Sequence, residues 1–513
     1  MVGLLRTGAG HTLVNPKTAG SLQSPRRCQQ AEIVFQAGRT CGRPVKLSPI
    51  DQIAPRDYNI IYFFFRERPG EEKESIFRNL EQGLQATIAQ IPELLCSVAE
   101  RQGDRDELEL VYGRDNGAAI SFKDYTSGQS CEQWRHGSFQ DLEREHFPYY
   151  KLESKLLLSS PELPGGQLRC LAMQANFIPG GLILSTRLHH LLCDGSGAYT
   201  FQRMLGRNVA AAANGSLSLG SPQLELIDRD TIVSGESDVR LSDLPDWRSV
   251  GSVGDSPEVA LKGTSWGSAP MPKVRYAVYY ISEPNMKRLR DKLTRPNDIC
   301  PSVVEAVGAF LWSSVLQARE VDSRRYPEAK LSITIDTRAR MRNPTVSSSY
   351  WGNLSEPNAV ARMPTGLLGH SYRADPDKER WRTTLPDAAL RIKQATAAVD
   401  NTAVRRLVGL LNQMPKATSL TWNVDRWPGP DMLLVCVNKL PFNDIDFGSQ
   451  LGCSEAFRFT VGDTEGKPDG RCLVLPPRKR DGRGLEVALQ YDEQTLDRLR
   501  QSTEFAEYFE WRN

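Results

Sequence analysis

One stretch in the first half of the chain passes from a strand pattern to a helix pattern within a few residues. In "GGLILSTRL", apolar or β-branched side chains recur at every second position from Leu182 to Leu188, which is typical of a β-strand. "GAYTFQRML" follows shortly after, with Ala198, Phe201 and Leu205 at helical spacing. A strand that leads straight into a helix indicates an α/β fold, in which helices cover a sheet.

The same alternation recurs in the second half of the chain. "VRYAVYYIS" and "KLSITIDTRAR" are strand-like, and "SVVEAVGAFLWSSVLQA" between them is helical. "CLVLPP" and "GLEVALQY" predict a hairpin, which an amphipathic helix follows. Residues 206–263 are instead rich in Gly, Ser, Pro and Asp. We therefore predict a disordered leader over 1–44, a first domain over 45–205, a crossover linker over 206–263 and a second domain over 264–513, with a cleft between the domains.

Composition limits the classes of partner. The net charge is +2, with Lys+Arg 64 against Asp+Glu 62, which argues against a nucleic-acid binder. The ten cysteines include no C-x-x-C pair, so neither a disulfide framework nor a zinc ribbon is indicated. The longest apolar runs are far shorter than the ~20 residues of a membrane helix. We expect a cytoplasmic monomer without a membrane span. The first thirty residues lack acidic side chains, but they resemble a disordered leader more than an organelle transit segment.

Two adjacent histidines, His189 and His190, directly follow the strand-like segment "GGLILSTRL". His190 falls on the face of Leu184, Thr186 and Leu188, whereas His189 points to the opposite face. A neutral imidazole, with an ordinary pKa of ~6.5, can take up a proton near neutrality. Gly195 is expected to permit the tight turn after the histidines, and Asp194 to hold that turn or to pair with an arginine. A buried structural histidine stays the alternative, and a metal site lacks further ligands because the other four histidines are isolated.

A second pattern suggests a serine nucleophile. "GTSWG" fits the G-x-S-x-G motif, which needs a helix directly after the serine. Pro270 and Pro272 follow instead, so we interpret Ser265 as a loop residue and expect direct transfer without an acyl-serine intermediate.

The segment "HHLLCDG" matches the HHxxxDG signature shared by the BAHD-type acyl-CoA-dependent acyltransferases and the condensation domains of nonribosomal peptide synthetases. Further segments match the BAHD side in chain order: "LSPIDQIAPRDY" with "FFF", "SVVEAVGAFLW", "DTRARMRNP" with "YWGN", and "LPFNDIDFG". From about Val45 to Tyr508 the chain thus resembles the BAHD family, and most of all its fungal branch, which acylates secondary metabolites, mycotoxins among them.

The resemblance implies two chloramphenicol-acetyltransferase-like domains with a solvent channel between them. It implies an acyl-CoA co-substrate, acetyl-CoA first, a small-molecule acceptor and no bound cofactor or metal. His190 would be the general base and Asp194 a structural partner that shapes its loop. The other implied site-shaping residues are Gly195, Asn353, Tyr350, and Asp446 paired with Arg338 or Arg340.

Three features depart from the family or fall outside its motifs. Cys436-Val437 stands where relatives have Ser-Trp, so a hydroxyl donor is either missing or supplied by "TSLTW" upstream. Ser449 and Gln450 follow the DFG triplet, which affects loop packing more than catalysis. The basic hairpin tip "RKRDGR" is interpreted as a solvated loop, with contact to coenzyme A phosphates as the alternative.

The predicted function is O-acylation of a fungal secondary metabolite by direct transfer. The alternatives are an N-acyltransferase or condensation-like enzyme that forms an amide, and a non-catalytic scaffold.

Overall fold

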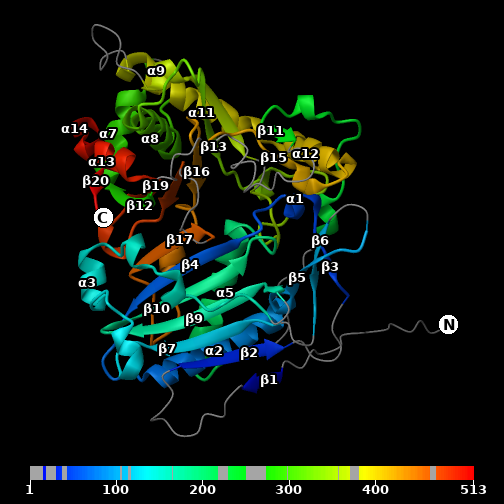
Figure 1. The fold of residues 1–513 in the computed structure, drawn as a ribbon, viewed down its shortest axis with the longest axis vertical. Helices are drawn as coiled ribbons and strands as arrows, with labels where there is room; N and C mark the ends of the chain where they lie inside the picture. The colour runs from blue at the N-terminus through cyan, green and yellow to red at the C-terminus, as the bar shows by residue number, and fades with distance from the viewer. Residues whose placement is uncertain are drawn as a thin grey trace, which may run out of the picture.

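The computed structural model describes residues 15–18, 30–36, 43–103, 107–113, 117–163, 166–217, 229–249, 273–296, 299–355, 358–369, 380–462 and 470–513. Two seven-stranded sheets form its centre, one below the other in Figure 1, and helices pack against them. The predicted α/β class with two sheet-based halves is confirmed.

The first sheet belongs mainly to the N-terminal half and has the order β1-β2-β7-β9-β10-β4-β17. Among the described strands of this sheet, β7 and β9 are the one parallel pair. The strand β4 is buried over almost its whole length, as its uninterrupted apolar run predicts for a central strand. The strands are β1 (Asn15–Thr18), β2 (Gln30–Gln36), β4 (Tyr58–Arg66), β7 (Ala119–Asp124), β9 (Leu171–Ile178), β10 (Gly181–His189) and β17 (Ala456–Val461).

The second sheet has the order β14-β13-β16-β18-β19-β12-β20. The predicted hairpin is confirmed, because β18 and β19 pair antiparallel. The strands are β12 (Val274–Ile281), β13 (Glu328–Ile333), β14 (Ala359–Pro364), β16 (Met432–Cys436), β18 (Arg471–Leu475), β19 (Leu485–Asp492) and β20 (Glu510–Trp511). The described residues also form two small sheets. One contains β3 (Val45–Lys46), β5 (Ser97–Glu100), β6 (Leu108–Val111) and β8 (Leu168–Arg169). The other pairs β11 (Trp247–Ser249) with β15 (Leu420–Trp422).

Helices pack against both sheets. α2 (Lys73–Gln90) lies against α5 (Gly195–Ala213), and both overlap the first sheet in the view of Figure 1. α8 (Val303–Arg319) lies against the second sheet, beside α7 (Glu283–Leu293), α11 (Leu385–Ala398) and α13 (Glu493–Gln501). α2 and α5 approach closely at Gly83, where a Cβ atom would come within 2.7 Å of the Val209 backbone nitrogen. The shorter or peripheral helices are α1 (Pro49–Gln52), α3 (Phe139–Arg144), α4 (Ser154–Leu157), α9 (Thr365–Gly369), α12 (Asn401–Gln413) and α14 (Thr503–Ala506).

The two halves interlock more than the predicted boundaries suggest. β17 comes from the C-terminal half, yet it pairs with β4 at the edge of the first sheet (Figure 1). β2 pairs with β7, although it lies inside the segment expected to be disordered. The expected linker begins inside α5 and contributes β11, which pairs with β15 of the second half. Gly263–Gly267, with Ser265, lies outside the described residues.

None of the helices in the described ranges is long and apolar enough to cross a membrane.

Candidate active site

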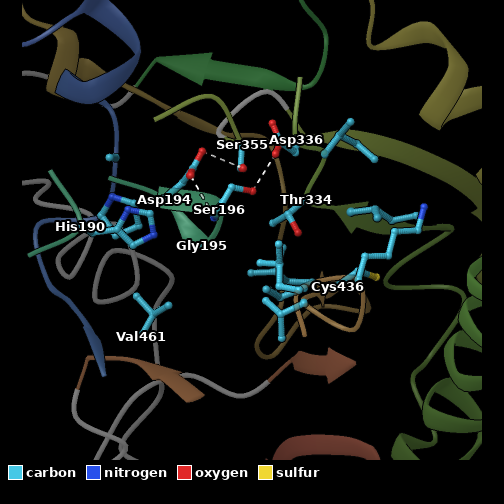
Figure 2. A pocket seen from close by; sticks show the side chains of 18 of the residues that line it. His190, Asp194, Gly195, Ser196, Thr334, Asp336, Ser355, Cys436 and Val461 are labelled. Carbon is cyan, nitrogen blue, oxygen red and sulfur yellow. Dashed lines mark hydrogen bonds between the residues drawn. The ribbon is translucent and has the colours of Figure 1, made fainter. Parts of the chain in front are cut away.

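A cavity of about 2270 Å³ lies between the two halves, and both halves supply its walls. His190, Asp194, Gly195 and Ser196 line it from the N-terminal half, and Thr334, Asp336 and Cys436 line it from the C-terminal half (Figure 2). The junction between β10 and α5 is therefore part of the wall of this cavity.

The two histidines at this junction have different surroundings. His190 follows the last residue of β10, and its backbone N–H donates to the carbonyl of Asp57 at 2.8 Å. His189 lies edge-on to the Tyr58 ring, with the centroids 4.9 Å apart, and its Nδ1 accepts the N–H of Leu191 at 3.2 Å. His190 lines the cavity and His189 does not. The strand alternation predicted this separation.

Asn353 defines which ring nitrogen of His190 carries the proton. Its Nδ2 donates to Oδ1 of Asp51 at 3.0 Å and to the His190 carbonyl at 2.9 Å. Its Oδ1 therefore faces Nδ1 of His190, at 3.1 Å. An amide oxygen only accepts, so Nδ1 holds the proton of the neutral ring and Nε2 keeps its lone pair. That leaves Nε2 as the nitrogen available to a proton donor in the cavity.

Burial keeps both rings neutral. It lowers the pKa of His190, although Asp194, the ring's hydrogen bonds and Asp57 act in the opposite direction. Burial, with the neighbouring His190, lowers the pKa of His189 to about 3. At neutral pH His190 is thus an unprotonated base in a largely water-excluded position.

Asp194 is fully occupied as a structural acceptor. Oδ1 accepts from the N–H groups of Ser196 and Gly197 and from Arg338, and Oδ2 accepts from Arg338, Leu354 and Ser355, all at 2.8 to 3.1 Å. Burial would raise the pKa of Asp194, but the Arg338 charge and these hydrogen bonds outweigh it and hold the pKa below its usual value. Asp194 therefore caps α5 and binds Arg338, and no lone pair remains for proton transfer.

Arg338 joins three motifs that lie far apart in the sequence. Besides Asp194, its guanidinium donates to the carbonyls of Tyr350 and Gly352. Asp336 also pairs with it, at 3.0 Å, and accepts from the Ser196 hydroxyl at 2.6 Å (Figure 2). The "DTRAR" segment thereby ties the "YWGN" segment to the start of α5. Tyr350 and Asn353 lie behind the cavity wall rather than on it.

The predicted pairing of Asp446 with Arg338 or Arg340 is wrong. Asp446 accepts the N–H of Gly448 within its own turn, at 2.9 Å. Arg338 pairs with Asp194 instead, and Arg340 donates to the carbonyls of Thr396 and Val399. The turn containing Asp446 packs against α5, where a Cβ atom on Gly206 would come within 3.0 Å of the Asp446 carbonyl. Asp446 thus supports the helix and not the arginine.

The expected role of Gly195 also needs correction. Gly195 does not adopt a left-handed backbone conformation, so the turn does not require glycine on that ground. The nearest atom to an added Cβ would be a Val437 methyl carbon, at 3.9 Å. Because Gly195 lines the cavity, its missing side chain leaves room in front of α5.

Sequence reasoning missed two residues behind His190, Asp51 and Arg229. Asp51 is fully buried and binds both the backbone and the side chain of Asn353. Arg229 pairs with Asp51 at 2.7 Å and comes from the segment interpreted as a linker. The one local signal is the capping box of Ser48 and Asp51 in "SPIDQ", which by itself indicates an ordinary helix start.

The wall opposite His190 includes Cys436 and Val437, the pair for which the resemblance led us to expect Ser-Trp. Figure 2 shows Thr334 and Cys436 across the cavity from His190. Burial raises the pKa of Cys436 to about 12, so its thiol stays protonated. Thr418 and Thr421 of "TSLTW" also line the cavity. That a hydroxyl donor comes from this segment stays a prediction.

The basic hairpin tip does not line the cavity. Arg478 is buried and pairs with Asp481 at 2.9 Å, and Arg480 pairs with Glu143 at 3.0 Å. The tip is thus a structural contact between the halves and not a fully solvated loop. Across the described ranges, no group of three or more His, Cys, Asp or Glu residues is arranged to hold a metal ion.

Comparisons with known proteins agree with this site. A family model described as the Transferase family matches residues 27–506. The chain is 28% identical to acyltransferase easC of Emericella nidulans, covering 91% of this chain and 95% of that protein. It is 25% identical to eremophilane O-acetyltransferase ORF8 of Penicillium roqueforti, covering 77% of this chain and 82% of that protein.

A solved structure has the same fold. TRI101 of F. graminearum, complexed with coenzyme A and T-2 mycotoxin, superimposes with a TM-score of 0.73 at 18% identity, covering 92% of this chain and all of that one. The family match extends over nearly the whole chain, including both walls of the cavity. The chain therefore belongs to the Transferase family and is a BAHD-type acyltransferase of its fungal branch.

Proposed function

We propose that the protein transfers an acyl group, acetyl first, from an acyl-CoA thioester to a hydroxyl group of a small secondary metabolite. The observation that carries this proposal is the state of His190. It is neutral, its Nδ1 is occupied by Asn353, and its Nε2 is available to a cavity built by both halves. Such a group suits general-base activation of a hydroxyl.

The reaction then needs one proton acceptor and no covalent enzyme intermediate. The acceptor hydroxyl gives its proton to Nε2 of His190 while its oxygen attacks the thioester carbonyl. The tetrahedral intermediate collapses with cleavage of the carbon–sulfur bond, and the coenzyme A thiolate takes the proton back from the imidazolium. Hydrogen-bond donors on the opposite wall, among them Thr334, would stabilise the developing oxyanion.

Similar proteins support an acyl-CoA donor and a small-molecule acceptor, but they do not decide which acyl group is transferred. The structural neighbour from F. graminearum was solved with coenzyme A and a mycotoxin, and one similar protein is an eremophilane O-acetyltransferase. Another, easC, is described only as an acyltransferase. The cavity of about 2270 Å³ has room for a donor and a bulky acceptor together.

The test is acyl transfer by the purified full chain and its His190→Ala variant. The wild type is given acetyl-CoA and a panel of sesquiterpenoid and polyketide alcohols, and both thiol release and product mass are measured. His190→Ala should lower kcat by at least about 10²-fold, the usual contribution of a general base. His136→Ala, at a histidine that pairs with Glu153 outside the cavity, should keep wild-type kcat.

The same assay separates the alternatives. Amine analogues of the alcohols test N-acylation, and butanoyl- and octanoyl-CoA test longer donors. Full activity of His190→Ala would overturn the mechanism. A wild type that acylates amines but no alcohol would replace O- by N-acylation, and absence of transfer to any acceptor would favour a non-catalytic scaffold.

A further inference from the structure

A buried chain of polar contacts runs from the crossover segment to the ring of His190. It passes from Arg229 through Asp51 and Asn353, which lie in three segments distant in the sequence. All four residues are at most 8% exposed. Such a network in a water-excluded region is rigid, since each unpaired group would be costly.

Asp51 is held from all sides by donors. Its Oδ1 accepts the backbone N–H of Asn353 at 2.8 Å and the Nδ2 group of Asn353 at 3.0 Å. Its Oδ2 accepts the backbone N–H and the hydroxyl of Ser48, both at 2.8 Å, and Arg229 at 2.7 Å. Ser48 and Arg229 thus fix the carboxylate, and its other oxygen is directed at Asn353.

Arg229 neutralises this buried carboxylate and connects it to the histidine turn. Its guanidinium pairs with Asp51 and, at 3.3 Å, with Glu93, and it donates to the Leu192 carbonyl at 3.0 Å. Burial would lower the pKa of Arg229, but the two carboxylates outweigh it and raise the pKa, so Arg229 stays charged. Leu192 lies two residues after His190, so the same side chain supports both Asp51 and the catalytic turn.

This arrangement opposes rotation of the Asn353 amide by half a turn. Rotation would place Oδ1 of Asn353 against the Asp51 carboxylate and the His190 carbonyl, two contacts between acceptors. It would also turn Nδ2 toward Nδ1 of His190, which favours the tautomer with the proton on Nε2. That tautomer has no lone pair available in the cavity.

We propose that Asp51 and Arg229 are positioning residues, which hold the Asn353 amide in the one orientation that keeps the proton of His190 on Nδ1. This inference rests on the proposed function, because it supposes that Nε2 is the base.

The test measures the tautomer of His190 in the resting enzyme, without substrate. Nitrogen-15 NMR of histidine-labelled protein distinguishes Nδ1–H from Nε2–H, and the spectrum of His190→Ala identifies the signals. We expect Nδ1–H in the wild type. In Asp51→Asn, a mixture of tautomers should appear. Donors face both oxygens of Asp51, so the NH2 group of the new asparagine can lie on either side. When it faces Asn353, it no longer repels the oxygen of the rotated Asn353 amide.

The kinetic arm uses the same variant. Asp51→Asn should lower kcat by about 10- to 100-fold, with the KM for acyl-CoA within about threefold, because proton transfer and not binding is impaired. A weaker hydrogen bond from Nδ1–H of His190 to Oδ1 of Asn353 should stabilise the imidazolium less, which moves the acid limb of the kcat profile to lower pH. The charged groups that face His190 and also set this limb, Asp194 and Asp57, are unchanged in the variant. A fold defect alone would lower the amount of active enzyme without moving the limb.

Two further variants control the result. Glu143→Gln removes a partly buried carboxylate that pairs with Arg66 and Arg480 away from the cavity, and should leave the tautomer and the pH limb unchanged. Arg229→Lys keeps the charge but cannot span Asp51 and the Leu192 carbonyl together, so an intermediate effect is expected. It also serves if Asp51→Asn does not fold.

The outcomes are separable. A wild type with the proton on Nε2, or an Asp51→Asn variant that retains Nδ1–H entirely, would overturn the inference. If the tautomer shifts as expected while the wild type transfers no acyl group, the proposed function fails and the positioning role stands.

Discussion

At the scale of single residues, two adjacent histidines are both neutral because both are buried, but their contacts give them different tasks. His190 keeps a lone pair available to the cavity, whereas Nδ1 of His189 accepts the Leu191 N–H and its ring packs on Tyr58. Both lose affinity for protons in the folded chain. The acid sensitivity of the fold therefore depends partly on these two rings.

His189 makes a measurable contribution to that sensitivity. Its folded pKa of about 3 lies below the ~6.5 of an unfolded chain, so the unfolded state binds more protons between these values. The contribution of His189 to the free energy of unfolding is fully present above pH ~6.5. It is lost as the pH falls toward 3, at about 1.4 kcal/mol per pH unit. The free energy of unfolding, measured with urea, should differ between pH 7 and pH 5 by about 2 kcal/mol less in His189→Asn than in the wild type. A pH difference in His189→Asn equal to that of the wild type would contradict the assignment.

At the scale of secondary-structure elements, the sequence predicts what depends on neighbours along the chain. The period of two in β10 and the helical stripe of α5 are both present in the structure, and strand parity alone separates His189 from His190. Contacts between distant segments left no such signal. Asp51 lies 178 residues from Arg229 and 302 from Asn353, so only its local capping role could be inferred. Asp446 was misassigned because family likeness offered an arginine, whereas the carboxylate closes its own turn.

The packing of α2 on α5 yields a prediction at the same scale. In an exposed helix, Gly→Ala stabilises by up to about 1 kcal/mol. A Cβ on Gly83 would instead come within 2.7 Å of the Val209 backbone, forcing the helices apart. Gly83→Ala should therefore lower the free energy of unfolding by about 1 to 3 kcal/mol, as overpacking does. Gly366→Ala in α9, where the nearest atom would lie at 3.7 Å, should cause no loss, and equal urea midpoints for the two variants would refute the close approach.

At the scale of the whole molecule, the halves share structure instead of merely touching. β17 lies in the C-terminal half of the sequence, yet it completes the first sheet beside β4. Arg458 on this strand is fully buried, pairs with Glu486 of β19 at 2.7 Å and donates to the Phe147 carbonyl. One side chain thus connects both sheets behind the cavity.

This connection predicts that the halves unfold together. Glu486→Gln leaves the Arg458 charge buried without its partner, which costs about 3 to 5 kcal/mol for pairs of this kind. Because β17 belongs to the first sheet and Glu486 to the second, the loss should lower the urea midpoint of both halves equally. Pulsed hydrogen exchange with mass spectrometry follows peptides from β4 and from α8 separately along the urea series. Coincident curves, displaced together in the variant, are expected, and a shift confined to the α8 peptides would show that the halves are independent folding units.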